Sequence, residues 1–142
     1  MTAAALRWKR ILKVRAIQRQ MAEVQLHRCE TELRNIMDLS SRIDTIRNAA
    51  QPSAVMQSGL MLRSICELSG RLDSARLALV NPSQNATEAR DRQQRLVIAA
   101  KQRETAVEKL DAAKSGQEVK RAYERASRAA IVRNIPKIRG ML

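Results

Sequence analysis

Residues 3–50 have the sequence AAALRWKRILKVRAIQRQMAEVQLHRCETELRNIMDLSSRIDTIRNAA, which contains neither Gly nor Pro. Apolar residues recur along it at steps of three and four, the period of an amphipathic helix. They form three groups: Val14, Ile17, Met21 and Val24; Leu26, Cys29, Leu33 and Ile36; and Leu39, Ile43, Ile46 and Ala50. Because the step from Val24 to Leu26 breaks the period, we expect a coiled-coil stripe with stutters. One helix of about 45 residues would be about 68 Å long, so its stripe needs a partner.

The composition favours long helices over a sheet. Of 142 residues, 44% are hydrophobic but 1% are aromatic, and there are 4 Gly and 3 Pro. Sheets and compact cores depend on aromatic and β-branched side chains, and many short elements need more turn residues. The longest apolar runs, such as Leu96–Ala100, are far shorter than the roughly 20 residues of a membrane span. We therefore expect a soluble, all-α protein.

A proline separates this first helix from a second helical arm. Pro52 cannot continue a helix, so we expect a bend at about 51–53. The second arm covers about 54–130 and has the most regular heptad of the sequence. Its apolar positions are Met61, Ile65, Leu68, Leu72, Ala75 and Leu79.

The second arm is expected to be interrupted once. Asn81-Pro82-Ser83 predicts a kink or a short loop, with a break at about 81–87. Pro136 and Gly140 predict a frayed tail over 131–142. The predicted fold is a long antiparallel two-stranded coiled-coil hairpin, with residues 1–142 as a single elongated domain and 3–50 as its first arm.

Positive charge is concentrated at both ends of the chain. The sequence has 27 Lys and Arg against 14 Asp and Glu, a net charge of +13. Residues 1–20 contribute +6 and residues 111–142 contribute +5, whereas residues 21–80 sum to zero. In an antiparallel hairpin these ends would meet and form a basic tip, which would attract an anionic partner.

No motif for catalysis, for a cofactor or for a metal occurs in the sequence. There is no phosphate-binding Gly-rich loop, and His27 is the sole histidine. Cys29 and Cys66 lack CxxC spacing, so we expect reduced core thiols in a cytoplasmic protein. We expect no enzymatic activity and no cofactor. Residues 1–20 are also typical of a mitochondrial presequence, but the helical pattern continues past them.

The basic tip leaves three kinds of anionic partner open: nucleic acid, a membrane surface or an acidic protein. Nucleic-acid phosphates would bind the basic residues in a salt-dependent way. Base stacking needs aromatic side chains, and Trp8 and Tyr123 are the only ones present. No specific nucleic acid is therefore expected. A membrane surface could be contacted by the basic helix that carries Leu6, Trp8, Ile11 and Leu12.

Two stretches are similar to the FliJ family of the bacterial flagellar type III export apparatus. They are LRWKRILKVRAIQRQMAEVQLHRCETELRNI, at 6–36, and RQQRLVIAAKQRETAVEKLDAAKSGQEVKRAYERASRAA, at 92–130. The resemblance lies in the basic start, the helical ladder and the hairpin architecture over most of the chain. It implies a non-enzymatic coiled coil, similar to the central stalk of rotary ATP synthases, in the cytoplasm and at the inner membrane of the flagellar base. A stalk subunit of another rotary or secretion ATPase fits the same pattern.

The resemblance also implies partners. They are the hexameric export ATPase, whose ring would take the basic tip, the cytoplasmic part of the export gate, and export chaperones that the chain would escort. For the ATPase ring the candidate residues are Arg7, Trp8, Arg10, Lys13, Arg121, Arg125 and Arg128. For the gate they are Met61, Ile65, Leu68 and Leu72.

Overall fold

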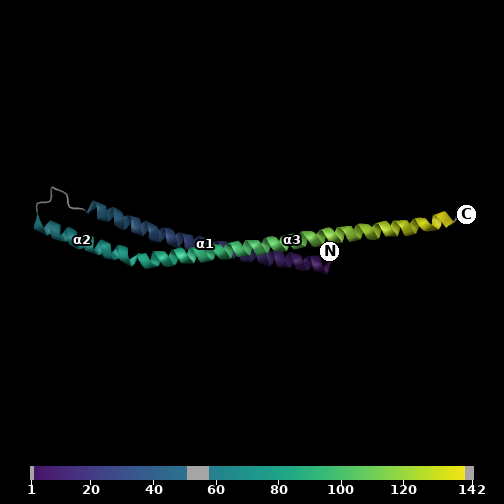
Figure 1. Ribbon diagram of the computed structural model, residues 1–142, viewed down its shortest axis with the longest axis horizontal. Coiled ribbons are helices and arrows are strands. Elements are labelled where there is room, and N and C mark those ends of the chain that lie inside the picture. Colours follow the sequence, from purple (N-terminus) through teal and green to yellow (C-terminus); the bar gives the residue numbers. More distant parts are fainter. Residues whose placement is uncertain (1, 51–57, 140–142) are drawn as a thin grey trace. The chain divides into compact units, whose positions relative to one another are not determined.

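The computed structural model describes residues 2–50 and 58–139, without the side chains of 134–139. These residues form three helices, α1 (Ala3–Ala49), α2 (Gly59–Ala78) and α3 (Val80–Arg139), and none of them lies in a strand (Figure 1). The predicted all-α class is confirmed. The bend predicted at 51–53 lies outside the described residues. In the part of the chain that is described, no helix is long and apolar enough to cross a membrane.

Contacts among the helices divide the chain into two units. The middle unit comprises Gln20–Ile98. The terminal unit comprises Met1–Arg19 together with Ala99–Leu142. The two ends of the sequence therefore belong to the same unit, whereas the prediction of one elongated domain stays a prediction.

In the middle unit, α1 is antiparallel to α2 and to the first part of α3. Arg47 Nη1 lies 3.1 Å from Asp73 Oδ1. Gln93 Nε2 donates a hydrogen bond of 3.2 Å to the carbonyl oxygen of Ala22. From the first contact to the second, the residue numbers fall along α1 and rise along α2 and α3, so the two sides are antiparallel.

The side chains of the middle unit that lose solvent contact form a narrow seam between the helices. Leu33, Ala86 and Val97 are buried, and most of the other seam residues are half-buried. Seam positions follow each other at alternating steps of three and four, a heptad repeat. On α1 they are Ala22, Leu26, Cys29, Leu33, Ile36, Ser40, Ile43 and Arg47. On α2, α3 and the Leu79 junction they are Ile65, Ser69, Leu72, Leu79, Ser83, Ala86, Arg90, Gln93 and Val97, and the exposed Arg76 occupies the remaining heptad position.

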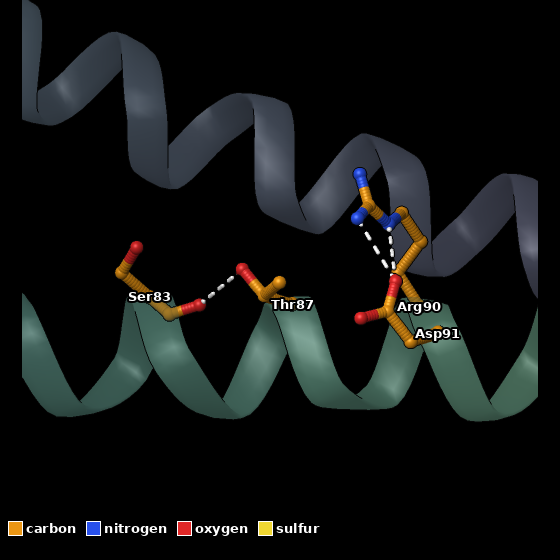
Figure 2. Close-up of polar contacts among 4 residues, drawn as sticks. All are labelled: Ser83, Thr87, Arg90 and Asp91. Carbon is orange, nitrogen blue, oxygen red and sulfur yellow. Dashed lines mark hydrogen bonds and ion pairs between the residues drawn. The ribbon is translucent and has the colours of Figure 1, made fainter.

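Two polar side chains on or beside the seam of α3, those of Arg90 and Thr87, are paired within α3 itself. Figure 2 shows Thr87 Oγ1 donating a 2.9 Å hydrogen bond to the Ser83 carbonyl oxygen. Beside it, Arg90 donates from Nε and Nη2 to Asp91 Oδ1, at 3.1 and 2.9 Å. A charged seam residue can therefore remain near α1 because the next residue along the chain supplies its counter-charge.

The seam of α1 lies on a different face from part of the predicted stripe. Before the middle unit it continues through Ala5, Trp8, Leu12, Arg15 and Arg19, all half-buried, without a stutter. The apolar residues predicted there are 52–64% exposed, and two later ones are 48–49% exposed. The prediction was wrong for these residues because it ranked positions by hydrophobicity, whereas the real seam of α1 includes three arginines. The exposed residues are Val14, Ile17, Met21, Val24, Leu39 and Ile46.

The junction between α2 and α3 is shorter than predicted, and no break occurs over 81–87. Leu79 alone separates the two helices, and its φ and ψ of −85° and −10° are themselves helical. The Leu79 N–H donates a hydrogen bond of 3.2 Å to the carbonyl oxygen of Ala75, and the Ser83 N–H donates one of 3.0 Å to the carbonyl oxygen of Leu79. Pro82 lies in the first turn of α3, where its missing N–H and fixed φ are tolerated.

In the terminal unit, the start of α1 is antiparallel to α3 over about two and a half heptads. Arg19 forms an ion pair with Glu104 near one end of this contact. Thr2 Oγ1 donates a 3.0 Å hydrogen bond to Glu118 Oε1 at the other end. Val107 is buried between these two contacts.

Among the described residues, only α3 continues past the start of α1, which lies beside Glu118 (Figure 1). Every described side chain from Ala112 to Arg133 is exposed. The helix extends to Arg139, so the tail predicted from 131 onward is helical over its described part. The two basic ends share one unit, but their helices do not end side by side. Thr2 lies beside Glu118, and α3 extends well beyond that point.

Candidate partner-binding surface

Nearly all of the net charge belongs to the terminal unit. That unit has 17 Lys and Arg against 5 Asp and Glu, a net +12, whereas the middle unit has 10 against 9, a net +1. The charge is therefore a property of one unit and not of the whole surface. Such an excess attracts anionic partners and raises their association rates.

Trp8 forms the centre of a basic groove on this unit. Its ring lies at a seam position of α1, and Lys114 Nζ of α3 stands 4.6 Å from the ring centroid. A cation over an exposed ring contributes about 0.5–1 kcal/mol. The open groove has a volume of about 600 Å³, and we call its four largest polar or aromatic residues the groove cluster. They are Arg7, Trp8, Arg10 and Lys114.

A second basic feature, the arginine ladder, lies on α3 beyond Glu118. It consists of Arg121, Arg125 and Arg128, which are exposed and follow each other at steps of four and three. At about 1.5 Å per residue, Arg128 lies about 15 Å along the helix axis from Glu118. The ladder is therefore separate from the groove cluster.

The sequence-predicted residues are only partly brought together. Arg7, Trp8 and Arg10 share the groove, whereas Lys13 is exposed on α1 outside it. The three predicted arginines of α3 lie in the same unit as the groove, but they belong to the arginine ladder. Contact of either group with an ATPase ring stays a prediction.

Lys114 is a groove residue that sequence reasoning missed. It is one lysine within a charged stretch, and its importance follows from the pairing of α3 with α1. One signal was available, because Lys114 precedes Arg121 and Arg128 at intervals of seven residues. That spacing places all three on one face of a supercoiled helix.

The four residues predicted to contact the gate have two different environments on α2. Met61 and Leu68 are exposed at 56% and 41%, so both are accessible. Ile65 and Leu72 are half-buried seam residues. The heptad pattern selected Leu68 although it is exposed, and Leu60, at 79% exposed, is a nearby apolar residue that the pattern did not select.

The thiols and acidic groups give no further site in the described residues. Cys29 and Cys66 are free, the first half-buried and the second exposed, so the expectation of core placement was wrong for Cys66. Within 2–50 and 58–139, no three His, Cys, Asp or Glu side chains lie close enough together to hold a metal ion.

Comparison with protein-family models, with curated proteins and with solved structures found no match to the chain.

Proposed function

We propose that this protein is a non-enzymatic component of the bacterial flagellar type III export apparatus. In this proposal the chain is an antiparallel coiled-coil hairpin whose basic terminal unit inserts into the ring of the hexameric export ATPase. It works in the cytoplasm, at the membrane base of the flagellum, and couples ATP hydrolysis to export. It would also escort export chaperones.

One observation supports the proposal most strongly. The net +12 of the terminal unit arises where two stretches distant in sequence lie side by side. A ring or pore with an acidic lumen would offset the self-repulsion of those charges. The groove cluster adds a Trp, a residue type that is enriched among binding hot spots.

The contact with the export gate is assigned to the exposed apolar side of α2. Met61 and Leu68 are accessible there, so they are the stronger pair among the four candidates. Ile65 and Leu72 would support them from the seam.

The test is the activity of the hexameric export ATPase of the same organism, with and without this protein. The unaltered chain is expected to raise both the ATPase rate and the hexamer fraction. The variant Arg7→Glu/Arg10→Glu/Arg125→Glu/Arg128→Glu should abolish the gain, because it reverses charges in both the groove cluster and the ladder.

A matched control has the same change in net charge on the middle unit. Arg34→Glu/Arg42→Glu/Arg63→Glu/Arg71→Glu reverses four exposed arginines and should leave the stimulation intact. The proposal fails if the unaltered chain changes neither quantity, or if both variants lose the gain equally.

The alternative is a nucleic-acid or anionic-membrane binder that uses the same basic unit. The exposed arginine ladder favours it, since guanidinium groups bind phosphate as well as carboxylate. A filter-binding titration at two salt concentrations separates the two functions, because phosphate contacts give a steep salt dependence. Weak binding at physiological salt would remove this alternative.

A further inference from the structure

The part of α3 that extends past the start of α1 has no neighbour among the described residues. Residues 119–133, beyond the contact of Glu118 with Thr2, span about 22 Å of helix, and all of their side chains are exposed. We call them the free arm. A helix of this length is only marginally stable in water without a packed face. The free arm is therefore suited to a partner that covers one of its sides.

The side that a partner would cover follows from the seam. In the terminal unit the seam of α3 runs through Ala100, Glu104, Val107 and Asp111, with Lys114 and Glu118 contacting α1 next. The same alternation of three and four then reaches the three arginines of the ladder. The ladder occupies the heptad positions that α1 covers earlier along α3.

The charge of the free arm defines the chemistry of the partner. Residues 119–133 contain five Lys and Arg and one Glu, a net +4. Arg121 and Arg125, and Arg125 and Arg128, are at helical neighbour spacings, where like charges repel. A second copy of the arm would add to this repulsion. A partner with carboxylates at the same spacing would remove it and form charge-assisted pairs.

We propose that the free arm docks against an acidic amphipathic helix of another protein, which continues the seam with carboxylates facing Arg121, Arg125 and Arg128. The proposal deepens the proposed function by naming the chemistry of one contact of the terminal unit. The identity of the protein that supplies the helix rests on the proposed function.

Other classes of partner fit the free arm less well. Tyr123 is two residues from both Arg121 and Arg125, which places it about 200° around the helix from each. A single nucleic acid strand could therefore not stack a base on Tyr123 and contact the ladder with its phosphates at the same time. Alanine is the commonest apolar residue of the arm, at 122, 126, 129 and 130. Alanine gains little free energy from insertion into a bilayer, because its buried area is small.

The experiment uses the full chain and a designed peptide as the probe. The peptide is a 24-residue amphipathic helix with Glu at a and d positions over two heptads and Leu on the flanking heptads, labelled for fluorescence anisotropy. A second peptide has Gln in place of each Glu. The acidic peptide should bind the chain at least about tenfold more tightly than the Gln peptide, and the difference should shrink at high salt.

Two variants locate the binding. Arg121→Gln/Arg125→Gln/Arg128→Gln should weaken binding of the acidic peptide by about tenfold, since three ion pairs are lost. Arg34→Gln/Arg42→Gln/Arg63→Gln, which removes three exposed arginines of the middle unit, should bind it as the unaltered chain does. Circular dichroism of each variant checks that its helices are retained. In the bound state, amides of 119–133 should become protected from hydrogen exchange.

Several outcomes would overturn the proposal. They are equal affinity for the two peptides, equal loss in the two variants, or no new protection in the free arm. Tighter, ladder-dependent binding of single-stranded DNA or of anionic phosphatidylserine vesicles would assign the arm to phosphate instead. If the peptide binds as expected while the ATPase is not stimulated, the proposed function fails and this inference stands. The reverse result removes this inference alone.

Discussion

The middle and terminal units are both built on a pair of antiparallel helices, but the residues between their helices differ. The seam of the middle unit on α1 is mostly apolar from Leu26 to Ile43. The seam of the terminal unit includes Arg15 and Arg19 on α1, and it places a carboxylate or an amine at most steps of α3. Apolar burial stabilises by about 25 cal/mol per Å², whereas exposed ion pairs contribute about 0–1 kcal/mol. The heptad period therefore locates the contact, and the residue types determine its strength.

This difference bears on the proposed function. The middle unit has the composition of a stable scaffold, with nearly balanced charge. The terminal unit has a weaker and more polar seam, together with the charge that a partner would recognise. Regions of lower local stability are those from which binding segments are usually drawn. We therefore expect the terminal unit to open before the middle unit.

The largest expected effect comes from the apolar seam. Leu33 is 5% exposed, so Leu33→Ala should lower the free energy of unfolding by about 2–3 kcal/mol, through lost burial and a residual cavity. Urea denaturation followed by circular dichroism measures the change. Leu39→Ala, on the same helix but 49% exposed, should cost less than about 1 kcal/mol. Equal losses would mean that the helices do not meet along the seam described.

The ion pairs give a smaller and more specific comparison. Side chains of Arg19 and Glu104 are 27% and 15% exposed, whereas those of Arg47 and Asp73 are 41% and 48% exposed. A double-mutant cycle to alanine should give a coupling of about 1 kcal/mol for the first pair and less than about 0.5 kcal/mol for the second.

Salt provides the control for these cycles. Raising the salt concentration to about 1 M should reduce the coupling of Arg47 with Asp73 by the larger fraction, because exposed charges are screened more. If the pair in the middle unit is the stronger one, the terminal seam does not depend on charge as we describe.

The first helix was predictable from sequence, but the face it uses was not. Absence of Gly and Pro defined α1 to within a residue at each end. Its seam was mislocated before Leu26 because Val14 and Ile17 are more hydrophobic than Arg15 and Arg19. An arginine can occupy a seam position when the facing helix supplies a carboxylate, as Glu104 does, and that information is about 85 residues away in the sequence.

The candidate surface was predictable to a similar degree. Arg7, Trp8 and Arg10 were found from charge and from the rarity of aromatics, and the structure places them in one groove. Lys114 was not found, since nothing in its local sequence distinguishes it from neighbouring lysines. The level at which the two basic ends meet was also mispredicted, because it depends on the register of α1 against α3, which the contact of Thr2 with Glu118 defines.

The smallest expected effect tests which face of α1 is covered in the terminal unit. Ile17 is 53% exposed, whereas Leu12 is half-buried on the seam. Ile17→Gln should change the free energy of unfolding by less than about 0.5 kcal/mol, since little apolar area is lost and Gln is the better helix former. Leu12→Gln should cost about 1 kcal/mol, because it removes a partly buried side chain. Chemical denaturation of the two variants measures both values. The opposite ranking would restore the stripe through Val14 and Ile17, and it would turn the ladder of α3 away from the side on which we place the acidic helix.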